Sequence, residues 1–385
     1  MSRDRHLRRS RSGSPTGRRA LGALTLIGVA GLLAACAPAS RNGSGHGSTP
    51  ALDASRAPVP AAPTTTRPAP TTTRPTTYVT AGARAGIGGC DLFPVDHAFH
   101  ASIASLPVRS GSAATIAAIG PSETVLPGFS AEAWMGSRSG YPTNLIDSRT
   151  APRSFVAVAS MYQSVSENQS VPWPDDPRFE GWPNRAWDRH LLTVDTHRCE
   201  SWELINAQAP GENVFAALLH PGSWYADRVV RLDLSSNTIP PTGTVTASGL
   251  SMLAGLVRYD EVASGRVDHA LSMVLPDIGA GATWPASRSD GRSTDPAAPP
   301  MGTWFRLRAD VDISGLGPQA RIVAQAMKDH GVVLVDTGPH AAISGEPDVR
   351  WDDADLDGLR SLTIGQFEVV DPTPMKVADG SYRIR

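Results

Sequence analysis

Residues 255–262 read GLVRYDEV, residues 265–276 read GRVDHALSMVLP, residues 284–290 read WPASRSD and residues 299–308 read PPMGTWFRLR. Polar and apolar residues alternate from Arg266 to Leu275 and again from Thr303 to Ile313. Such alternation predicts β-strands that pack one face on a core. The same blocks also bring acids, a histidine, two tryptophans and several arginines together. We therefore expect the active or binding site of the protein in this region.

Short apolar segments on both sides of this region predict further strands. We expect them at residues 154–161, 190–195, 201–206, 214–219, 229–234 and 332–335. Gly and Pro separate these segments closely, as in sandwiches and barrels. Helices are predicted at residues 113–119, 248–257, 318–330 and 351–362. The pattern predicts a mostly β (α+β) fold, with a single β-sandwich or barrel-like domain and a few short helices.

The first block supplies two predicted catalytic residues, Asp260 and Glu261, and the second block supplies His269. Two adjacent acids can act as a general acid–base pair; a solvated helix start or a structural salt bridge is the alternative. His269 falls on the apolar face of its strand, where burial can tune its pKa for proton transfer. A core histidine bonded to the backbone is the alternative there. Glycoside cleavage needs a second carboxyl group, and Asp290 and Asp336 are the candidates for it.

The predicted ligand-binding residues are Trp304, Arg306 and Trp284. Within the alternating segment 303–313, Trp304 and Arg306 fall opposite the apolar side chains, so we expect them on an exposed face. Tryptophan faces can stack on sugar rings, and arginine binds anionic groups. A solvated face of Arg–Asp pairs is the alternative. The loop at residues 171–190 adds three tryptophans, which are either a sugar platform or core aromatics.

The N-terminus has the zones of a bacterial export signal. Seven arginines precede a 16-residue apolar run, Ala20–Ala35, which is short for a membrane span of roughly 20 residues. The run ends in Leu33-Ala34-Ala35-Cys36, which resembles the lipobox of bacterial lipoproteins. The resemblance implies that Cys36 receives a diacylglyceryl group and becomes the mature N-terminus. An ordinary signal peptide with a chance cysteine is the alternative.

The segment after Cys36 has the composition of a tether. Residues 36–85 are almost all Ala, Pro, Thr, Ser, Gly and Arg, so they cannot bury enough apolar surface to fold. We therefore predict a lipoprotein signal peptide at residues 1–35, a disordered tether at 36–85 and a folded β-rich domain at 86–385. The lipid would hold the domain at the extracytoplasmic face of the cell membrane.

Charge and cysteine content limit the partners and the kinds of site that we expect. Without residues 1–35, Lys plus Arg falls from 35 to 28 and Asp plus Glu from 37 to 36, which leaves a net charge near −8. An acidic body argues against nucleic acid as a partner. Cys90 and Cys199 remain beside Cys36, and two cysteines in an exported domain predict a disulfide; buried free thiols are the alternative. Since no CxxC or histidine cluster accompanies them, we expect no metal site and no cofactor.

From about Cys90 to Asp371 the chain resembles a family of exported bacterial proteins. The matching blocks are GLVRYDEV (255–262), DHAL (268–271), WPA (284–286), PPMG (299–302), DISG (312–315), DHGVVLVDTG (329–338), ISG (343–345) and RW (350–351). The family has no established activity, so the resemblance implies no catalytic residue. The sequence contains no G-x-S-x-G motif, no P-loop, no HExxH motif and no dinucleotide-binding glycine motif. These absences count against esterases, NTPases, zinc proteases of the HExxH class and Rossmann enzymes, respectively.

These observations lead to one functional expectation and one rival. We expect a surface-tethered domain that binds or hydrolyses a polysaccharide of the envelope or the environment. The rival is a non-catalytic envelope lipoprotein that serves as a scaffold or binding module. Two carboxylates across a tryptophan-lined cleft would favour the enzyme, because glycoside cleavage needs such a pair, whereas a flat surface with all acids in salt bridges would favour the module.

Overall fold

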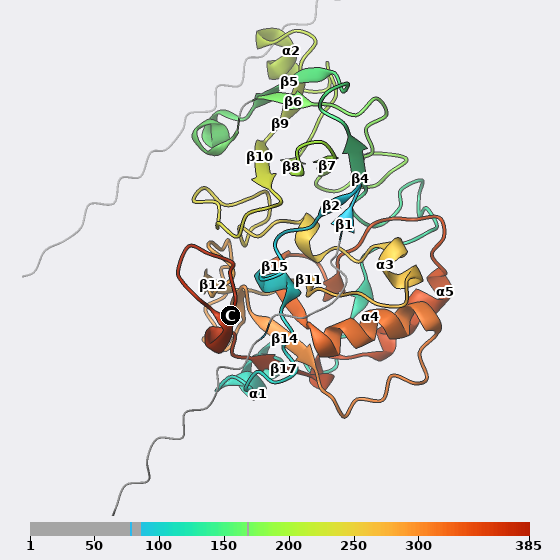
Figure 1. Ribbon diagram of the computed structural model, residues 1–385, viewed down its shortest axis with the longest axis vertical. Helices are drawn as coiled ribbons and strands as arrows, with labels where there is room; N and C mark the ends of the chain where they lie inside the picture. The colour runs from blue at the N-terminus through green and yellow to red at the C-terminus, as the bar shows by residue number, and fades with distance from the viewer. Residues whose placement is uncertain (1–77, 79–85, 168) are drawn as a thin grey trace, which may run out of the picture. The chain divides into compact units, whose positions relative to one another are not determined.

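Two parallel strands, β11 and β15, form the middle of the largest sheet. This sheet has six strands in the order β17–β14–β15–β11–β16–β3; β16 and β3 are also parallel, and the other neighbours are antiparallel (Figure 1). Its strands are β3 (Leu126–Pro127), β11 (Leu271–Leu275), β14 (Trp304–Leu307), β15 (Val332–Thr337), β16 (Ala342–Ile343) and β17 (Phe367–Val370). The four residues 332–335 are all buried, which is why this strand is a continuous apolar run in the sequence.

The computed structural model describes residue 78, residues 86–167 and residues 169–385. All of them belong to one compact unit, Thr72–Arg385. This unit contains its own hydrophobic core and a disulfide, so we expect it to fold without the preceding segment. The predicted lipidation site, Cys36, lies outside the described residues.

Two smaller sheets and two short strand pairs complete the β-structure. One sheet has the order β10–β8–β7–β4 and the other the order β6–β5–β9. The first consists of β4 (Thr143–Ile146), β7 (Leu191–Asp195), β8 (Glu200–Ile205) and β10 (Arg228–Asp233), and the second of β5 (Arg153–Val158), β6 (Ser170–Pro172) and β9 (Trp224–Ala226). The pairs are β1 (Gly86–Ile87) with β2 (Cys90–Asp91), and β12 (Gly279–Ala282) with β13 (Pro300–Met301). Strand residues outnumber helical ones and one sheet curls into a half-barrel, so the predicted mostly β class is confirmed.

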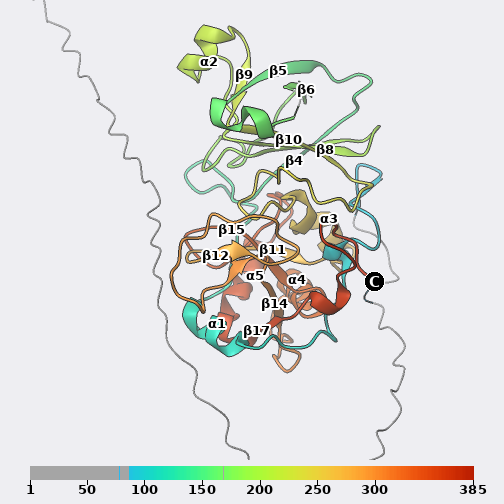
Figure 2. The same ribbon diagram turned by 90° about the vertical axis from the view of Figure 1, so that its left-hand side faces the viewer.

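The helices are short, apart from α4 (Pro318–Asp329), which packs against β14. It begins with Pro318, whose missing N–H is not needed in a first turn, and it ends before Gly331, which has a positive φ of 74°. Figure 2 shows α1 beside β17, at the edge of the same sheet. The other α-helices are α1 (Ser112–Ile119), α2 (Val214–Leu219), α3 (Tyr259–Ala263) and α5 (Asp353–Leu356). The 3₁₀ segments are η1 (Ala98–His100), η2 (Ser160–Val165), η3 (Leu253–Gly255), η4 (Asp357–Ser361), η5 (Ile364–Gln366) and η6 (Thr373–Met375).

Cys90 and Cys199 form the predicted disulfide, with 5.4 Å between their Cα atoms. Cys90 lies in β2, and Cys199 lies in the turn between β7 and β8. The bond therefore ties the start of the described domain to the four-stranded sheet.

Two secondary-structure predictions were wrong. Residues 214–219 form helix α2 and not a strand, because the Asn213 side chain accepts the Ala216 N–H and caps a helical turn. The predicted helix at 248–257 is reduced to the three-residue η3. There Ser248 Oγ accepts the Leu250 N–H and contacts Thr246 Oγ1 at 3.0 Å, so the segment uses local turns in place of a helix.

The predicted strand at 303–313 is also shorter, since β14 ends at Leu307. The expectation that Trp304 faces solvent is wrong: its side chain is fully buried. β14 lies inside the six-stranded sheet between β17 and β15, and both of its faces are covered. Alternation therefore did not separate a buried face from an exposed one.

Candidate functional site

Asp336 lies at the carboxyl end of β15, next to the carboxyl end of its parallel neighbour β11. Its carboxylate accepts the N–H groups of Ala247 (3.2 Å) and Thr337 (2.8 Å). The Thr337 hydroxyl donates to Asp290 Oδ1 at 3.3 Å, which brings a second carboxylate to this end of the sheet. Carboxyl ends of parallel strands are where α/β sheets commonly place ligand-binding groups.

A third acidic side chain, Glu180, comes from the tryptophan-rich loop. Glu180 is buried, and its Oε2 accepts the His190 N–H at 3.3 Å while its own N–H donates to the His190 carbonyl at 2.9 Å. Between them, Trp187 and Arg189 have positive φ angles of 51° and 52° on either side of Asp188. Side chains other than glycine rarely adopt this conformation, and such strain concentrates at functional sites.

Tyr141 connects the two groups of acids. Its ring meets the His190 ring edge-on with 5.5 Å between centroids. Burial, followed by the charges of Glu180, Asp336 and Asp188, raises the pKa of Tyr141 well above its usual range. We call Tyr141, Glu180, Asp188, Asp290 and Asp336 the acidic centre.

The carboxyl groups of the acidic centre form no ion pair with any other described residue. Burial, with a smaller contribution from the charges of Asp188 and Asp336, raises the pKa of Glu180 to about 8. Burial and the charges of Asp290 and Asp188 raise the pKa of Asp336 to about 6. At pH 7 the centre therefore holds a protonated Glu180 near a mostly ionised Asp336.

His190 adds an unsatisfied polar atom beside Tyr141. The residue is buried, and its Nδ1 has no hydrogen-bond partner among the described residues. Burial lowers the pKa of His190 to about 4, so its ring is neutral at pH 7. A buried polar atom without a partner is uncommon, and the ring that carries this one meets the Tyr141 ring edge-on.

The raised pKa of Glu180 predicts a loss of stability at alkaline pH. A carboxyl group whose pKa is raised by folding binds more protons in the native state than in the unfolded state. Its contribution to the free energy of unfolding therefore falls as pH rises through the folded pKa. Between pH 6.5 and pH 9, a pKa of about 8 for Glu180 corresponds to a loss of about 2 kcal/mol in the free energy of unfolding, at 1.36 kcal/mol per pKa unit. Urea unfolding of residues 72–385 at both pH values measures this loss. Glu180→Gln should remove the part of the loss that is due to Glu180, while Glu203 and Glu346, whose pKa values burial raises to about 7, keep their parts; the exposed Glu132→Gln should leave the loss unchanged.

The sequence-predicted residues Glu261 and His269 lie together in a separate, buried network. Glu261 Oε1 accepts from Arg258 at 2.6 Å, and Glu261 Oε2 lies 3.2 Å from His269 Nε2. His269 is fully buried, and its Nδ1 lies 2.9 Å from the Ala270 carbonyl. Although burial opposes ionisation, Arg258 and His269 lower the pKa of Glu261 to about 2. Of the interpretations that the sequence left open, this geometry favours a structural salt bridge for Glu261 and a core histidine for His269.

Breaking this network should destabilise the fold. Glu261→Gln is expected to lower the free energy of unfolding by about 3 kcal/mol, because Arg258 would keep a buried charge without a carboxylate partner. Denaturant unfolding measures the effect. The adjacent Asp260→Asn is the control, since the Asp260 side chain is 82% exposed and its surface pair should contribute less than about 1 kcal/mol. Equal losses for the two variants would contradict the structural role of Glu261.

Asp260 points away from the Glu261 network and pairs with Arg350 at 2.8 Å. The Arg350 guanidinium also lies over the Tyr259 ring, 4.1 Å from its centroid, and pairs with Asp348. Asp260 and Glu261 thus have separate partners, so neighbouring positions in the sequence do not make them a catalytic pair.

The three predicted ligand-binding residues are all held by other parts of the protein. Trp304 donates its Nε1–H to the His330 carbonyl at 2.9 Å inside the core. Arg306 pairs with Glu368 at 2.6 Å and donates to backbone carbonyls of residues 103, 104 and 106. Trp284 donates to the Ser381 carbonyl at 2.9 Å. The structure does not bring these three side chains together in one site.

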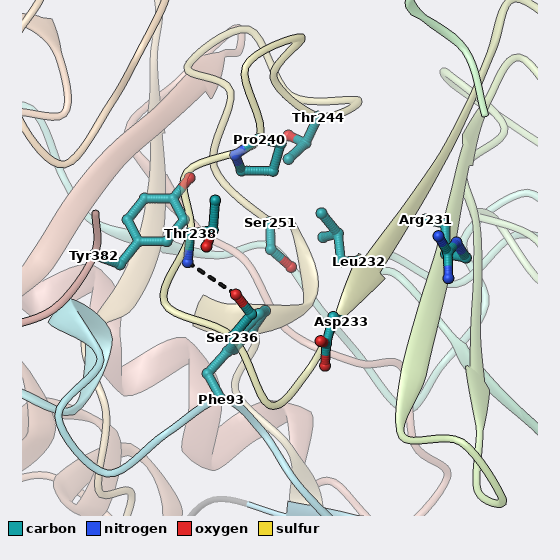
Figure 3. A pocket seen from close by; sticks show the side chains of 10 residues that line it. All are labelled: Phe93, Arg231, Leu232, Asp233, Ser236, Thr238, Pro240, Thr244, Ser251 and Tyr382. Atoms are coloured by element: carbon teal, nitrogen blue, oxygen red, sulfur yellow. Dashed lines mark hydrogen bonds between the residues drawn. The ribbon is translucent and has the colours of Figure 1, made fainter. Parts of the chain in front are cut away.

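Figure 3 shows a small cavity of about 150 Å³ between β10 and the residues that follow it. Ser251 lies on its wall and donates to the buried Glu203 at 2.7 Å. Phe93 and Tyr382 supply aromatic surface, and the Thr238 N–H donates to Ser236 Oγ at 3.1 Å. Sites for small ligands commonly have volumes of roughly 300–1,000 Å³, so this cavity is small for such a ligand.

Other site types have no support within the part of the chain that the structure describes. No group of three or more His, Cys, Asp or Glu side chains there is arranged to hold a metal ion. None of the described helices is long and apolar enough to cross a membrane. No protein-family model, curated protein or solved structure significantly matches the chain.

Proposed function

We propose that this protein is an exported lipoprotein whose folded domain cleaves or binds a polysaccharide of the envelope or the environment. One observation carries the proposal: the acidic centre holds two carboxyl groups with different pKa values, and neither of them pairs with a cationic side chain of the described residues. Environments that separate the pKa values of two nearby carboxyl groups are typical of general acid–base catalysis. This conclusion moves the expected catalytic residues from Asp260 and Glu261 to Glu180 and Asp336.

The two carboxyl groups suit different steps of glycoside cleavage. Glu180, with a pKa of about 8, would protonate the oxygen of the leaving sugar. Asp336, with a pKa of about 6, would act as the ionised carboxylate, either on water or on the sugar carbon. When the glycosidic bond breaks, the proton of Glu180 goes to the leaving oxygen, and water supplies the hydroxyl group of the new reducing end. The remaining proton of that water goes to Asp336 if Asp336 acts on water, with Glu180 regaining its proton from solvent, or to Glu180 if Asp336 has first bonded to the sugar carbon.

Exposed tryptophans on the neighbouring loops could hold the sugar chain. The Trp187 side chain, next to Asp188, is 54% exposed, and that of Trp134 is 74% exposed. Trp134 belongs to a turn that joins the Glu180 loop, because Arg138 donates its N–H to the Trp182 carbonyl at 3.1 Å. A flat aromatic ring suits a pyranose face, and tryptophan presents the largest such surface.

The anchor in this proposal is the lipid on Cys36, followed by the Pro- and Thr-rich tether. A chain of this composition stays extended at about 3.1 Å per residue where polyproline II holds. The domain could then reach polysaccharide at a distance from the extracytoplasmic face of the membrane. Mass spectrometry of the protein isolated from membranes would test the anchor, with loss of the lipid mass in Cys36→Ser.

A panel of bacterial and plant polysaccharides tests the activity. Residues 72–385, with the disulfide intact, are incubated with each polymer, and both retention on the polymer and release of reducing sugars are measured. Release that disappears in Asp336→Asn supports the proposed reaction. Trp187→Ala should weaken retention with little effect on folding, because its side chain is exposed.

The rival function is a non-catalytic binding module or scaffold. The ion pairs of Asp260, Glu261 and Arg306 favour it for that region of the protein. Retention without release of sugars would establish a binding module. Neither retention nor release on any polymer would contradict the polysaccharide proposal as a whole.

A further inference from the structure

Helix α2 exposes most of its apolar surface. Its sequence is VFAALL, and the exposed fractions of Val214, Phe215, Leu218 and Leu219 are 75%, 79%, 76% and 71%. Only Ala216 of this helix is buried. A six-residue helix that leaves four large apolar side chains in water loses the burial that normally stabilises such helices. Exposed apolar patches of this kind mark binding sites.

Two cavities flank α2. One, of about 420 Å³, separates Phe215 and Leu219 of the helix from Val158 of β5 and Tyr225 of β9. The other, of about 580 Å³, lies between Leu219 and the side chains of Phe155 and Trp224. Both cavities are lined by Leu219 and His220, so they adjoin along the helix. Figures 1 and 2 agree that α2 lies beside β5 and β9. We call these adjoining cavities the α2 groove.

The groove has the size and lining of a site for an apolar ligand. Each cavity falls within the range of roughly 300–1,000 Å³ found for small-molecule sites. The apolar side chains gather at the helix, and neutral amides such as those of Gln163 and Asn213 lie at the first cavity. A narrow apolar chain that follows the helix would cover Phe215 and Leu219 at once.

The charged side chains along the groove indicate the chemistry of the polar end of the ligand. No Asp or Glu lines either cavity, although the mature chain is acidic. Arg153 lines the second cavity, and its guanidinium group donates to Ser170 Oγ at 3.1 Å and to the Ser170 carbonyl. It forms no ion pair with another described residue. Arg153 also borders a cavity that Glu167, Asp195 and Glu200 line, but no described acid pairs with it. A cation at one end of an apolar groove is complementary to an anionic amphiphile.

We propose that the α2 groove binds a fatty-acid-class ligand, with a single acyl chain along α2 and its carboxylate at Arg153. The chain length determines affinity through apolar burial, and Arg153 selects the anionic head. The site is separate from the acidic centre and does not depend on the proposed polysaccharide reaction.

Titration calorimetry with monomeric decanoate and 1-decanol, on residues 72–385, tests the proposal. Decanoate is expected to bind one molecule per chain. Affinity should rise roughly fourfold per added methylene from octanoate to dodecanoate, since each buried CH₂ contributes about 0.8 kcal/mol. Phe215→Ser should weaken binding at least about tenfold, because it removes a large apolar contact. Val349→Ser, at an apolar side chain that is 65% exposed elsewhere, should leave binding unchanged.

The head group is tested by a second substitution. Arg153→Gln should weaken decanoate about tenfold and 1-decanol less than about twofold, because only the acid carries a charge for Arg153. Arg149→Gln, at an exposed arginine that already pairs with Asp147, should change neither affinity. Unfolding curves of each variant show whether it is folded.

Several outcomes would overturn this inference. Absence of decanoate binding, equal effects of Arg153→Gln on the acid and the alcohol, or an unchanged affinity in Phe215→Ser would each exclude the site. Binding to phosphatidylcholine vesicles without binding of monomeric decanoate would make α2 a membrane-contact surface instead. Self-association that Phe215→Ser abolishes, without ligand binding, would make the groove an interface between two copies of the chain.

Discussion

Glu180→Gln is expected to lower the rate of sugar release from the cleaved polysaccharide by about 10²–10⁴-fold, the usual contribution of a positioned general acid. The amide has almost the shape of the carboxyl group but cannot give a proton to the leaving oxygen. Because the native carboxyl group is neutral below its pKa of about 8, the substitution leaves the charge near pH 7 nearly unchanged. The rate loss would therefore report proton donation and not a change in local charge.

The pH dependence of kcat/KM gives this prediction a second measurement. The wild-type rate should rise as Asp336 ionises through a pKa of about 6 and fall as Glu180 loses its proton through a pKa of about 8. Glu180→Gln should remove the alkaline limb, and Asp336→Asn should remove the acid limb. Asp277→Asn, at an exposed side chain that accepts from Ser293 at 2.9 Å, serves as the control. A profile with both limbs intact in Glu180→Gln would show that Glu180 is not the acid.

Asp260→Asn decides between the sequence-based assignment and the structural one. If sugar release disappears in Asp260→Asn but persists in Glu180→Gln, the sequence-based residues are correct and the acidic centre is not the site of cleavage. The structure argues against this result, because Asp260 pairs with Arg350 at the surface and not with a second carboxyl group.

Local patterns in the sequence predicted much of the fold. The residues predicted as a strand pair around His197 and Arg198 are β7 and β8, which are antiparallel neighbours. The helix predicted from Pro318 is α4, with the same first residue. The helix predicted at 351–362 begins with α5, where the Asp352 carboxylate accepts the N–H groups of Ala354 and Asp355. Each of these depends on residues close in sequence, which is where pattern rules apply.

The failures have two causes: a local cap that the apolar pattern does not report, and coverage by elements that are distant in the sequence. The apolar run at 214–219 suited a strand equally well, and the turn at Asn213 selected the helix. Strict alternation in β14 placed Trp304 on a face that we expected to be exposed, but the neighbouring elements cover both faces. Alternation reports the side to which each residue points and does not report what covers that side.

The candidate site was predicted only in fragments. Asp336 and Asp290 were considered as carboxyl partners, and the tryptophan-rich loop was noted as a sugar platform. Glu180 lies in that loop, 156 positions before Asp336. The two carboxyl groups come close enough for the charge of Asp336 to raise the pKa of Glu180 only through the packing of elements that are distant in the sequence. Tyr141 was missed entirely; in the sequence it has only the neighbouring Gly140 and Pro142, which indicate a turn. Burial, which raises the pKa of Glu180, also cannot be derived from local sequence.

Removing the disulfide is expected to destabilise residues 72–385 by about 4–5 kcal/mol. The bond spans 109 positions, and in the chain-entropy model closing such a loop restricts the unfolded state by about that amount. Urea unfolding of Cys90→Ala/Cys199→Ala against the oxidised wild type measures the loss. Reduction of the wild type should shift its midpoint similarly. An unchanged midpoint in both experiments would contradict a stabilising role.

The backbone at Cys199 provides a sharper version of the same experiment. Cys199 has a φ of 51°, a left-handed conformation that costs an alanine roughly 1–2 kcal/mol and a glycine almost nothing. In the oxidised protein the bond to Cys90 helps hold this conformation. Cys90→Ala/Cys199→Gly should therefore be more stable than Cys90→Ala/Cys199→Ala by up to about 1 kcal/mol, once the greater freedom of unfolded glycine is subtracted. The reverse order would mean that the turn between β7 and β8 relaxes when the bond is lost, and that the disulfide itself imposes the left-handed backbone.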